Sequence, residues 1–146
     1  MSDIITVTHP VGDGGNYAMQ QANPYDKYLE NRIATASKEE LTLMLYDGAL
    51  KFCNQAIAAI EEKALEKAGE LIIRVENIIR EFQLTLDRKY EVTKNLDSLY
   101  EYIHRRLVEA NMEKSIAILE EMQFLLRELR DMWKTAMMNA RQQQAT

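Results

Sequence analysis

The chain has 146 residues, with 18 lysines and arginines against 23 aspartates and glutamates, and its formal net charge is −5. That length supports one domain with a single buried core, and the 47% of hydrophobic residues is enough to form that core. The acidic balance argues against sequence-independent nucleic-acid binding, while one cysteine and two histidines exclude an internal disulfide and most zinc chemistry.

The first 22 residues differ in composition from the rest of the chain. Residues 1–22 contain Pro10 and three of the five glycines, so we expect a flexible tail. They lack the basic and apolar regions of a secretory signal, and no stretch of the chain is apolar enough to span a membrane. The sequence therefore predicts a cytoplasmic protein without membrane insertion.

The next segment, 23–36, is predicted to be a short tail helix or docking segment. Asn23 can cap this helix with Pro24 at its first position, where a missing amide hydrogen costs least. Its apolar face contains Tyr25, Tyr28, Leu29 and Ile33. About ten residues cannot maintain a helix alone in water. We therefore expect this helix to dock on the rest of the protein or on a partner.

Beyond Pro24 the chain has no proline and is rich in helix-forming residues. Ser37 followed by Glu40 forms a capping box for a helix over 38–62, and a second helix is predicted over 64–88. Apolar residues recur every three or four positions in both helices, which is typical of a helix with one buried face. These residues are Leu43, Tyr46, Leu50, Cys53, Ile57 and Ile60, then Leu65, Ala68, Ile72, Val75, Ile79, Phe82 and Leu86.

The same period predicts a third helix from about 93 to 111 and a fourth from about 113 to 138. Their stripes are Leu96, Leu99, Ile103, Leu107 and Ala110, then Ile118, Met122, Leu125, Leu129, Met132 and Ala136. Short connections force successive helices to run antiparallel. The sequence therefore predicts an all-α fold: an antiparallel up-and-down four-helix bundle over 37–139, with a flexible N-terminal tail carrying a short helical segment. The end, 140–146, has no apolar anchor and is expected to fray.

One short motif is compatible with a metal site. Glu101 and His104 form a Glu-x-x-His step, but a di-iron bundle needs two such steps, and the other histidine, His9, lies in the tail. Cys53 falls on an apolar stripe, where a buried thiol is unreactive. No glycine-rich phosphate loop links a strand to a helix. The sequence therefore predicts no catalytic residue, no metal and no cofactor.

Apolar residues exceed what one bundle seam requires. The helix over 38–62 is apolar over more than half of its circumference, with its seam centred near Tyr46. On nearly the opposite side lie Leu41, Leu45 and Phe52. On the other helices the off-seam apolar residues are Ile73, Leu84, Tyr102, Val108 and Phe124. Single exposed apolar residues are ordinary, and the tail helix is one candidate to cover this surface. The other candidate is an amphipathic helix of a partner.

Four motifs, in order and with matching gaps between about 23 and 136, resemble the FliS family of flagellar secretion chaperones. The motifs are NPYDKY at 23–28, TASKEELTLMLYDGA at 35–49, NLDSLYEY at 95–102 continued by RRLVEAN at 105–111, and LRDMWK at 129–134. Each motif alone is a weak signal. The presence of all four motifs in the same order and spacing is a specific signal.

The resemblance implies a monomeric helical bundle of the bacterial cytoplasm that binds the C-terminal segment of flagellin one to one. That segment is disordered when free and otherwise assembles between subunits of the filament. Apolar grooves of the chaperone would keep flagellin monomeric and assist its delivery to the flagellar type III export apparatus. The residues alone leave open an alternative, a regulatory or scaffold bundle that binds a different amphipathic helix.

The predicted partner-binding residues combine the surplus apolar positions with the motif positions. They are Tyr25, Tyr28, Leu41, Met44, Leu45, Phe52, Ile73, Leu84 and Tyr102. Tyr25 and Tyr28 match the tail motif, which is expected either to lie over a groove and be displaced by flagellin or simply to anchor the tail.

Overall fold

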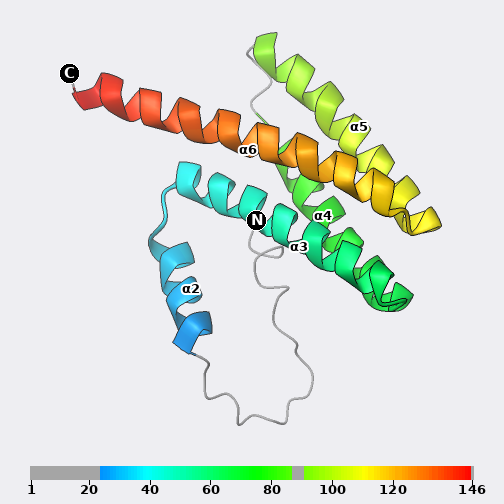
Figure 1. Cartoon of the computed structure of the whole chain (residues 1–146). Coiled ribbons are helices and arrows are strands. Elements are labelled where there is room, and N and C mark those ends of the chain that lie inside the picture. Colours follow the sequence, from blue (N-terminus) through cyan, green and yellow to red (C-terminus); the bar gives the residue numbers. More distant parts are fainter. Residues whose placement is uncertain (1–23, 87–90, 146) are drawn as a thin grey trace. The chain divides into compact units, whose positions relative to one another are not determined.

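The computed structural model describes residues 24–86 and 91–145, and the described residues are all-α, as predicted. Their helices, drawn in Figure 1, are α2 (Pro24–Thr35), α3 (Lys38–Glu61), α4 (Leu65–Thr85), α5 (Glu91–Glu113) and α6 (Ile116–Ala145). The chain divides into two units, Met1–Thr42 and Leu43–Thr146. The predicted flexible tail over 1–22 lies outside the described residues.

Helix α2 belongs to the first unit and begins at Pro24, while its predicted cap, Asn23, lies outside the described residues. Tyr25 and Tyr28 are nearly one turn apart, with ring centroids 6.5 Å apart, and the guanidinium of Arg32 lies 6.0 Å from the centre of the Tyr28 ring. Both tyrosines are more than half exposed. These contacts between neighbours on one helix face support α2 locally. Its docking on the bundle or on a partner stays a prediction.

The Ser37 half of the predicted capping box at the start of α3 is present. The hydroxyl of Ser37 accepts a hydrogen bond from the amide of Glu40 at 3.1 Å, and the Ser37 carbonyl accepts one from the amide of Leu41 at 2.9 Å. The first bond satisfies an amide that a helix terminus otherwise leaves unpaired, and the second is the first regular backbone bond of the helix. Ser37 therefore sets the point at which α3 begins.

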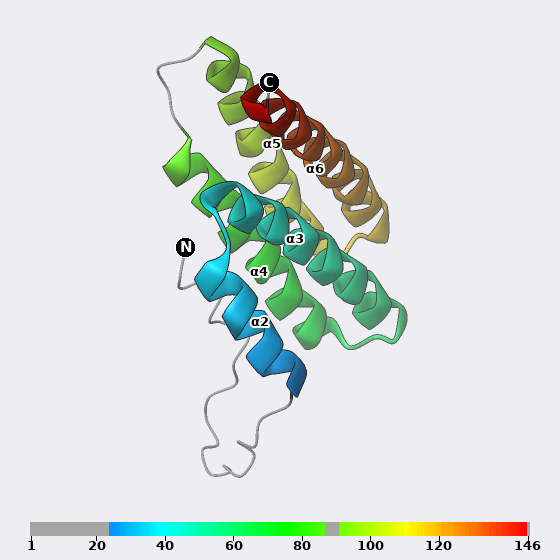
Figure 2. The same ribbon diagram turned by 90° about the vertical axis from the view of Figure 1, so that its left-hand side faces the viewer.

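In the second unit, α3, α4, α5 and α6 run in alternating directions (Figures 1 and 2), which confirms the antiparallel bundle. Helix α4 packs against α5, and α5 packs against α6. Helix α6 is also joined to α3, because Gln123 donates to Asn54 at 2.6 Å and Arg130 donates to Asp47 at 3.2 Å. The second unit is therefore held together on both flanks of α6.

Two connections are tight turns that each contain a lysine in the left-handed region, with φ of 62° at Lys63 and 51° at Lys114. The Lys114 ammonium donates to the backbone carbonyl of Asn111 at 2.7 Å and to its side-chain oxygen at 2.8 Å. The hydroxyl of Ser115 accepts a hydrogen bond from the amide of Ile118 at 3.2 Å. The turn between α5 and α6 thus closes one helix and caps the next.

The core consists of one face from each helix of the bundle, and the predicted stripes of α4 and α5 supply eight of the 22 buried apolar residues in the described part of the chain. On these helices the buried predicted residues are Ala68, Ile72, Val75, Ile79, Phe82, Ile103, Leu107 and Ala110. Leu65 is an exception at 48% exposed, because it lies in the first turn of α4, at the end of the bundle.

The buried face of α3 differs from the predicted one. Leu45, Ala49, Ala56 and Ala59 are buried beside Tyr46 and Cys53, whereas Leu50, Ile57 and Ile60 are only half-buried. At 100° per residue the observed face is turned by about 70° from the predicted one. Small side chains allow a close approach of helix axes, so α3 packs through its alanines rather than through its largest apolar residues.

The packed part of α6 ends earlier than predicted. Leu126 is buried in place of Leu125, and Leu129 is the last buried residue up to position 143, while Met132 and Ala136 are exposed. Helix α6 has 30 residues, whereas α3, α4 and α5 have 24, 21 and 23. An apolar stripe on the longest helix has fewer neighbours to bury it. The helix runs through the segment expected to fray, where the side chains of residues 139–143 are exposed.

An aromatic layer joins three helices of the bundle. The Phe82 ring of α4 lies between Tyr46 of α3, at a centroid distance of 4.4 Å, and Tyr100 of α5, at 5.6 Å. The two tyrosine hydroxyls are hydrogen-bonded to each other at 2.6 Å, and both side chains are buried. Burial raises the pKa of Tyr46 and of Tyr100 above the usual range, so both phenols stay neutral.

The hydrogen bond between the two tyrosine hydroxyls leads to a specific prediction about stability. Tyr100→Phe leaves the Tyr46 hydroxyl buried without its partner and should lower the free energy of unfolding by about 1–3 kcal/mol. The double variant Tyr46→Phe/Tyr100→Phe removes both polar groups and should lose less than the two single variants together. Urea denaturation of all four proteins measures this coupling. Strictly additive losses would show that the hydroxyls do not depend on each other.

Candidate partner-binding surface

Helix α4 presents two of the predicted contact residues to solvent. Ile73 is 48% exposed and Leu84 is 81% exposed. They are eleven residues apart, which is close to three helical turns, so their side chains leave the helix in nearly the same direction. The prediction that both lie off the seam is confirmed. Their contact with a partner stays a prediction.

The expected position of Leu45 is wrong. Leu45 is 4% exposed and belongs to the core, because α3 packs through its alanine-rich face. Phe52 is half-buried, and the guanidinium of Arg74 on α4 lies 5.4 Å from the centre of its ring, a cation–π contact. Phe52 therefore lies on the flank between α3 and α4. A buried Leu45 offers no surface to a partner while the bundle is closed.

The other predicted contact residues occupy separate places. Tyr25 and Tyr28 lie together on α2, and half-buried Leu41 is also in the first unit. Met44 and Tyr102 are half-buried in the second unit. The structure thus brings Tyr25 and Tyr28 into contact, places Ile73 and Leu84 about three turns apart along one face of α4, and leaves the remaining residues as single positions.

Several large apolar side chains outside the predicted set are also exposed. Met112 of α5 is 80% exposed, and Phe124, Met132 and Met138 of α6 are more than half exposed. Phe124 was recognisable from its place opposite the seam, whereas Met132 continues the core stripe and only the early end of packing on α6 exposes it. Methionine adapts its shape to varied partners. Outward apolar side chains therefore occur on α4, α5 and α6.

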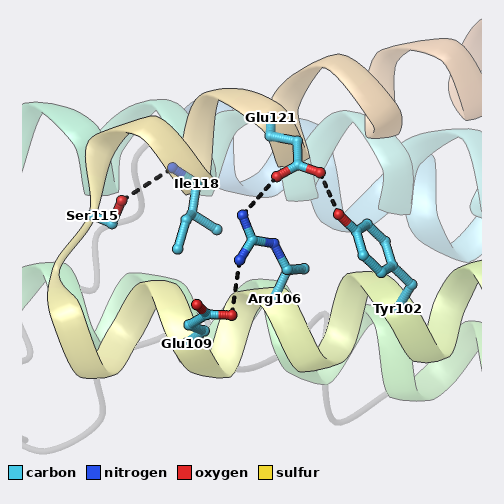
Figure 3. Close-up of polar contacts among 6 residues, drawn as sticks. All are labelled: Tyr102, Arg106, Glu109, Ser115, Ile118 and Glu121. Atoms are coloured by element: carbon cyan, nitrogen blue, oxygen red, sulfur yellow. Dashed lines mark hydrogen bonds and ion pairs between the residues drawn. The ribbon is translucent and has the colours of Figure 1, made fainter.

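Tyr102 belongs to a polar network between α5 and α6, shown in Figure 3. Its hydroxyl donates to one oxygen of Glu121 at 2.5 Å, and the guanidinium of Arg106 donates to the other at 2.9 Å. Arg106 also donates to Glu109 on its own helix at 2.8 Å. Its Nε is enclosed and has no hydrogen-bond partner among the described residues. Two side chains of α5 therefore donate hydrogen bonds to the two oxygens of one carboxylate on α6.

The network shifts the acidity of its members in consistent directions. The hydrogen bonds from Tyr102 and Arg106 lower the pKa of Glu121, so its carboxylate stays charged at neutral pH. The same bond to Glu121 raises the pKa of Tyr102, and the bonds to Glu121 and Glu109 raise the pKa of Arg106. Each group is therefore held in the protonation state that the network needs.

His104 lies on the other flank of α5. Its Nε2 is 3.9 Å from a carboxylate oxygen of Glu76 on α4. Burial, with a smaller effect from Arg80, lowers the pKa of His104 against the opposing effect of Glu101. The imidazole is therefore neutral at neutral pH, and the Glu-x-x-His step faces the α4–α5 flank rather than the bundle centre.

The remaining nucleophilic and potential metal-binding side chains add little reactivity. Cys53 is buried, and burial raises the pKa of its thiol to about 12, so the nucleophilic thiolate is scarce at neutral pH. Within residues 24–86 and 91–145, no three His, Cys, Asp or Glu side chains gather closely enough to hold a metal ion. In the same ranges, no helix combines the length and the apolar character needed to cross a bilayer.

Comparison with known proteins gives a consistent result. Residues 21–140 match the protein family described as Flagellar protein FliS. The flagellar secretion chaperone FliS of Bacillus subtilis strain 168 is 41% identical over 119 residues, which cover 82% of this chain and 90% of the relative. The flagellar secretion chaperone FliS of Escherichia coli strain K12 is 31% identical over 127 residues, which cover 84% and 93%. The matched range includes residues of every helix from α2 to α6.

The fold has a counterpart among solved structures. A protein described as a flagellar chaperone from bacteria, known from a crystal structure, superposes with a TM-score of 0.66. The match covers 84% of this chain and 99% of that chain, at 20% sequence identity. At this identity the likeness concerns the fold alone.

Proposed function

Since the chain belongs to the FliS family of flagellar secretion chaperones, we propose that its exposed apolar helix faces bind the C-terminal segment of flagellin. The family consists of chaperones rather than enzymes, so the activity is binding without chemical change. One chaperone monomer holds one flagellin in the cytoplasm and assists its delivery to the flagellar type III export apparatus.

The observation that carries this proposal is the outward apolar surface. Leu84 and Ile73 on α4, Met112 on α5 and Phe124 on α6 present apolar area to solvent on three helices. Each Å² of such area that a partner covers is worth roughly 25 cal/mol. A disordered segment that folds as it binds can reach several helices, because it wraps around a surface that a rigid partner would touch only once.

Binding prevents polymerisation by mass action. A chaperone that occupies the assembly-competent segment lowers the concentration of free flagellin and so shifts the equilibrium away from the filament. The segment loses conformational entropy when it becomes ordered, so a large contact area gives moderate affinity. Such a complex can release its cargo at the export apparatus without an energy-consuming enzyme.

The test uses purified flagellin C-terminal segment titrated calorimetrically into the full chain. The wild type should bind one to one and should delay filament growth of intact flagellin in a light-scattering assay. Ile73→Asp/Leu84→Asp should weaken binding at least tenfold, equal to about 1.4 kcal/mol, because two charges then face an apolar ligand. Leu65→Asp is the matched control, since Leu65 is as exposed as Ile73 on the same helix but points elsewhere.

Other results would contradict the proposal. Equal weakening by Leu65→Asp would show a general effect of charge on α4 rather than a contact face. No binding of flagellin by the wild type, together with recovery of a different protein in pull-downs from motile cells, would favour the regulatory or scaffold alternative.

A further inference from the structure

The polar network between α5 and α6 fixes how far along α5 the helix α6 lies. Tyr102 and Arg106 are four residues apart, so both side chains project from the same face of α5, one turn after the other. Each holds a different oxygen of Glu121 (Figure 3). A slip of α6 by one turn, about 5.4 Å, would break both bonds at once. Apolar contacts alone tolerate such slips far better, because they have no direction.

The composition of the network favours a role in register over a role in stability. Its members are partly exposed, so its ion pairs contribute little to folding. The enclosed Nε of Arg106 has no hydrogen-bond partner in the part of the chain that the structure describes, which is a cost that an apolar contact would avoid. Polar groups retained at such a cost are best known for selecting one packing arrangement among several.

The register between α5 and α6 determines where the second half of α6 lies. Beyond Leu129 no side chain described by the structure is fully buried, yet the apolar side of the helix continues through Met132, half-buried Trp133, Ala136 and Ala140. These residues lie within about 100° of one another around the helix and extend the line of Leu129. Leu129 is the last fully buried residue that the structure describes on α6, so the contacts that hold α6 further back, this network among them, contribute to where these residues lie.

We propose that Tyr102, Arg106 and Glu121 are positioning residues for partner binding. They hold α6 at one axial position on α5 and so place the apolar side of residues 132–140 where the flagellin segment packs. This inference rests on the proposed function, since flagellin is taken as the partner. Tyr102 then acts through Glu121 rather than as a direct contact.

The first experiment measures the position of α6 without any partner. Spin labels at Met112→Cys and Lys134→Cys report the distance between α5 and the far half of α6 by electron–electron double resonance, while buried Cys53 stays unlabelled. Arg106→Glu places three carboxylates together and should shift or broaden the distance distribution. Adding Glu121→Arg restores opposite charges and should restore the narrow distribution. Glu120→Gln, which removes an exposed charge one residue away, should leave it unchanged.

The second experiment measures affinity for the flagellin segment in the same network variants without the labelling cysteines, at a temperature where each is fully folded by circular dichroism. Arg106→Glu should weaken binding at least fivefold, and Arg106→Glu/Glu121→Arg should regain most of the loss. Tyr102→Phe and Glu121→Gln should give smaller losses in the same direction. A purely stabilising network would change the melting temperature but not the affinity of the folded protein.

Two results would overturn the inference. One is an unchanged distance distribution in Arg106→Glu, and the other is affinity within twofold of the wild type in that folded variant. Failure of the wild type itself to bind flagellin would contradict the proposed function instead, and the distance measurement would still decide whether the network sets the register.

Discussion

Replacing Leu45 by aspartate should unfold much of the second unit. Leu45 is 4% exposed, so a carboxylate there has neither water nor a cation to solvate it, and the apolar packing of the leucine is lost as well. An uncompensated buried charge alone costs about 3–5 kcal/mol. Domains of this kind are stable by only about 5–15 kcal/mol. Thermal and urea denaturation followed by circular dichroism should show a large loss of stability or no cooperative transition.

Leu84→Asp is the matched control for this experiment. The same substitution at a side chain that is 81% exposed leaves the new carboxylate in water and should change the free energy of unfolding by less than about 0.5 kcal/mol. The contrast distinguishes a core residue from a surface residue of the same type. A Leu45→Asp protein with near-normal stability and reduced flagellin binding would instead return Leu45 to the contact surface.

The second large effect is expected at Ile79, which is fully buried on α4. Ile79→Ala removes apolar atoms and leaves a cavity among close-packed neighbours, so the free energy of unfolding should fall by about 2–5 kcal/mol. The measurement is the urea midpoint with an unchanged denaturant slope.

The same helix offers an internal comparison for Ile79→Ala. Ile73→Ala removes the identical atoms from a half-exposed position and should cost less than about 1 kcal/mol. Leu50→Ala, at a half-buried position of α3, should fall between the two. Equal losses at Ile73 and Ile79 would mean that the outer face of α4 is covered in the folded protein.

Much of the fold was predictable because local signals agree. Ser37 caps α3 as its spacing from Glu40 predicts, and the stripe from Ile72 to Phe82 is buried as its period predicts. Helix period, caps and the absence of proline are properties of the chain itself, so they can be read without knowledge of neighbours. The motifs likewise identified the family that the comparisons show.

The candidate site was predictable only in part. Ile73 and Leu84 are exposed as expected, because α4 has a wide polar face that leaves little doubt about its seam. Leu45 is buried rather than exposed. Helix α3 is apolar on two sides, and the period of its apolar residues alone does not decide which side is buried. Met132 follows the core stripe of α6 in sequence but is exposed in the structure.

By itself, therefore, the sequence determined the helices, their antiparallel order and the family, because each of these follows from local spacing or from motifs in register. Only the tertiary structure decided which face of α3 is buried, where packing on α6 ends and that Tyr102 bonds to Glu121. These features depend on the distance between helix axes and on the relative lengths and register of neighbouring helices. Contacts between residues 19 or more positions apart, such as Tyr102 with Glu121, leave no periodic trace along the chain.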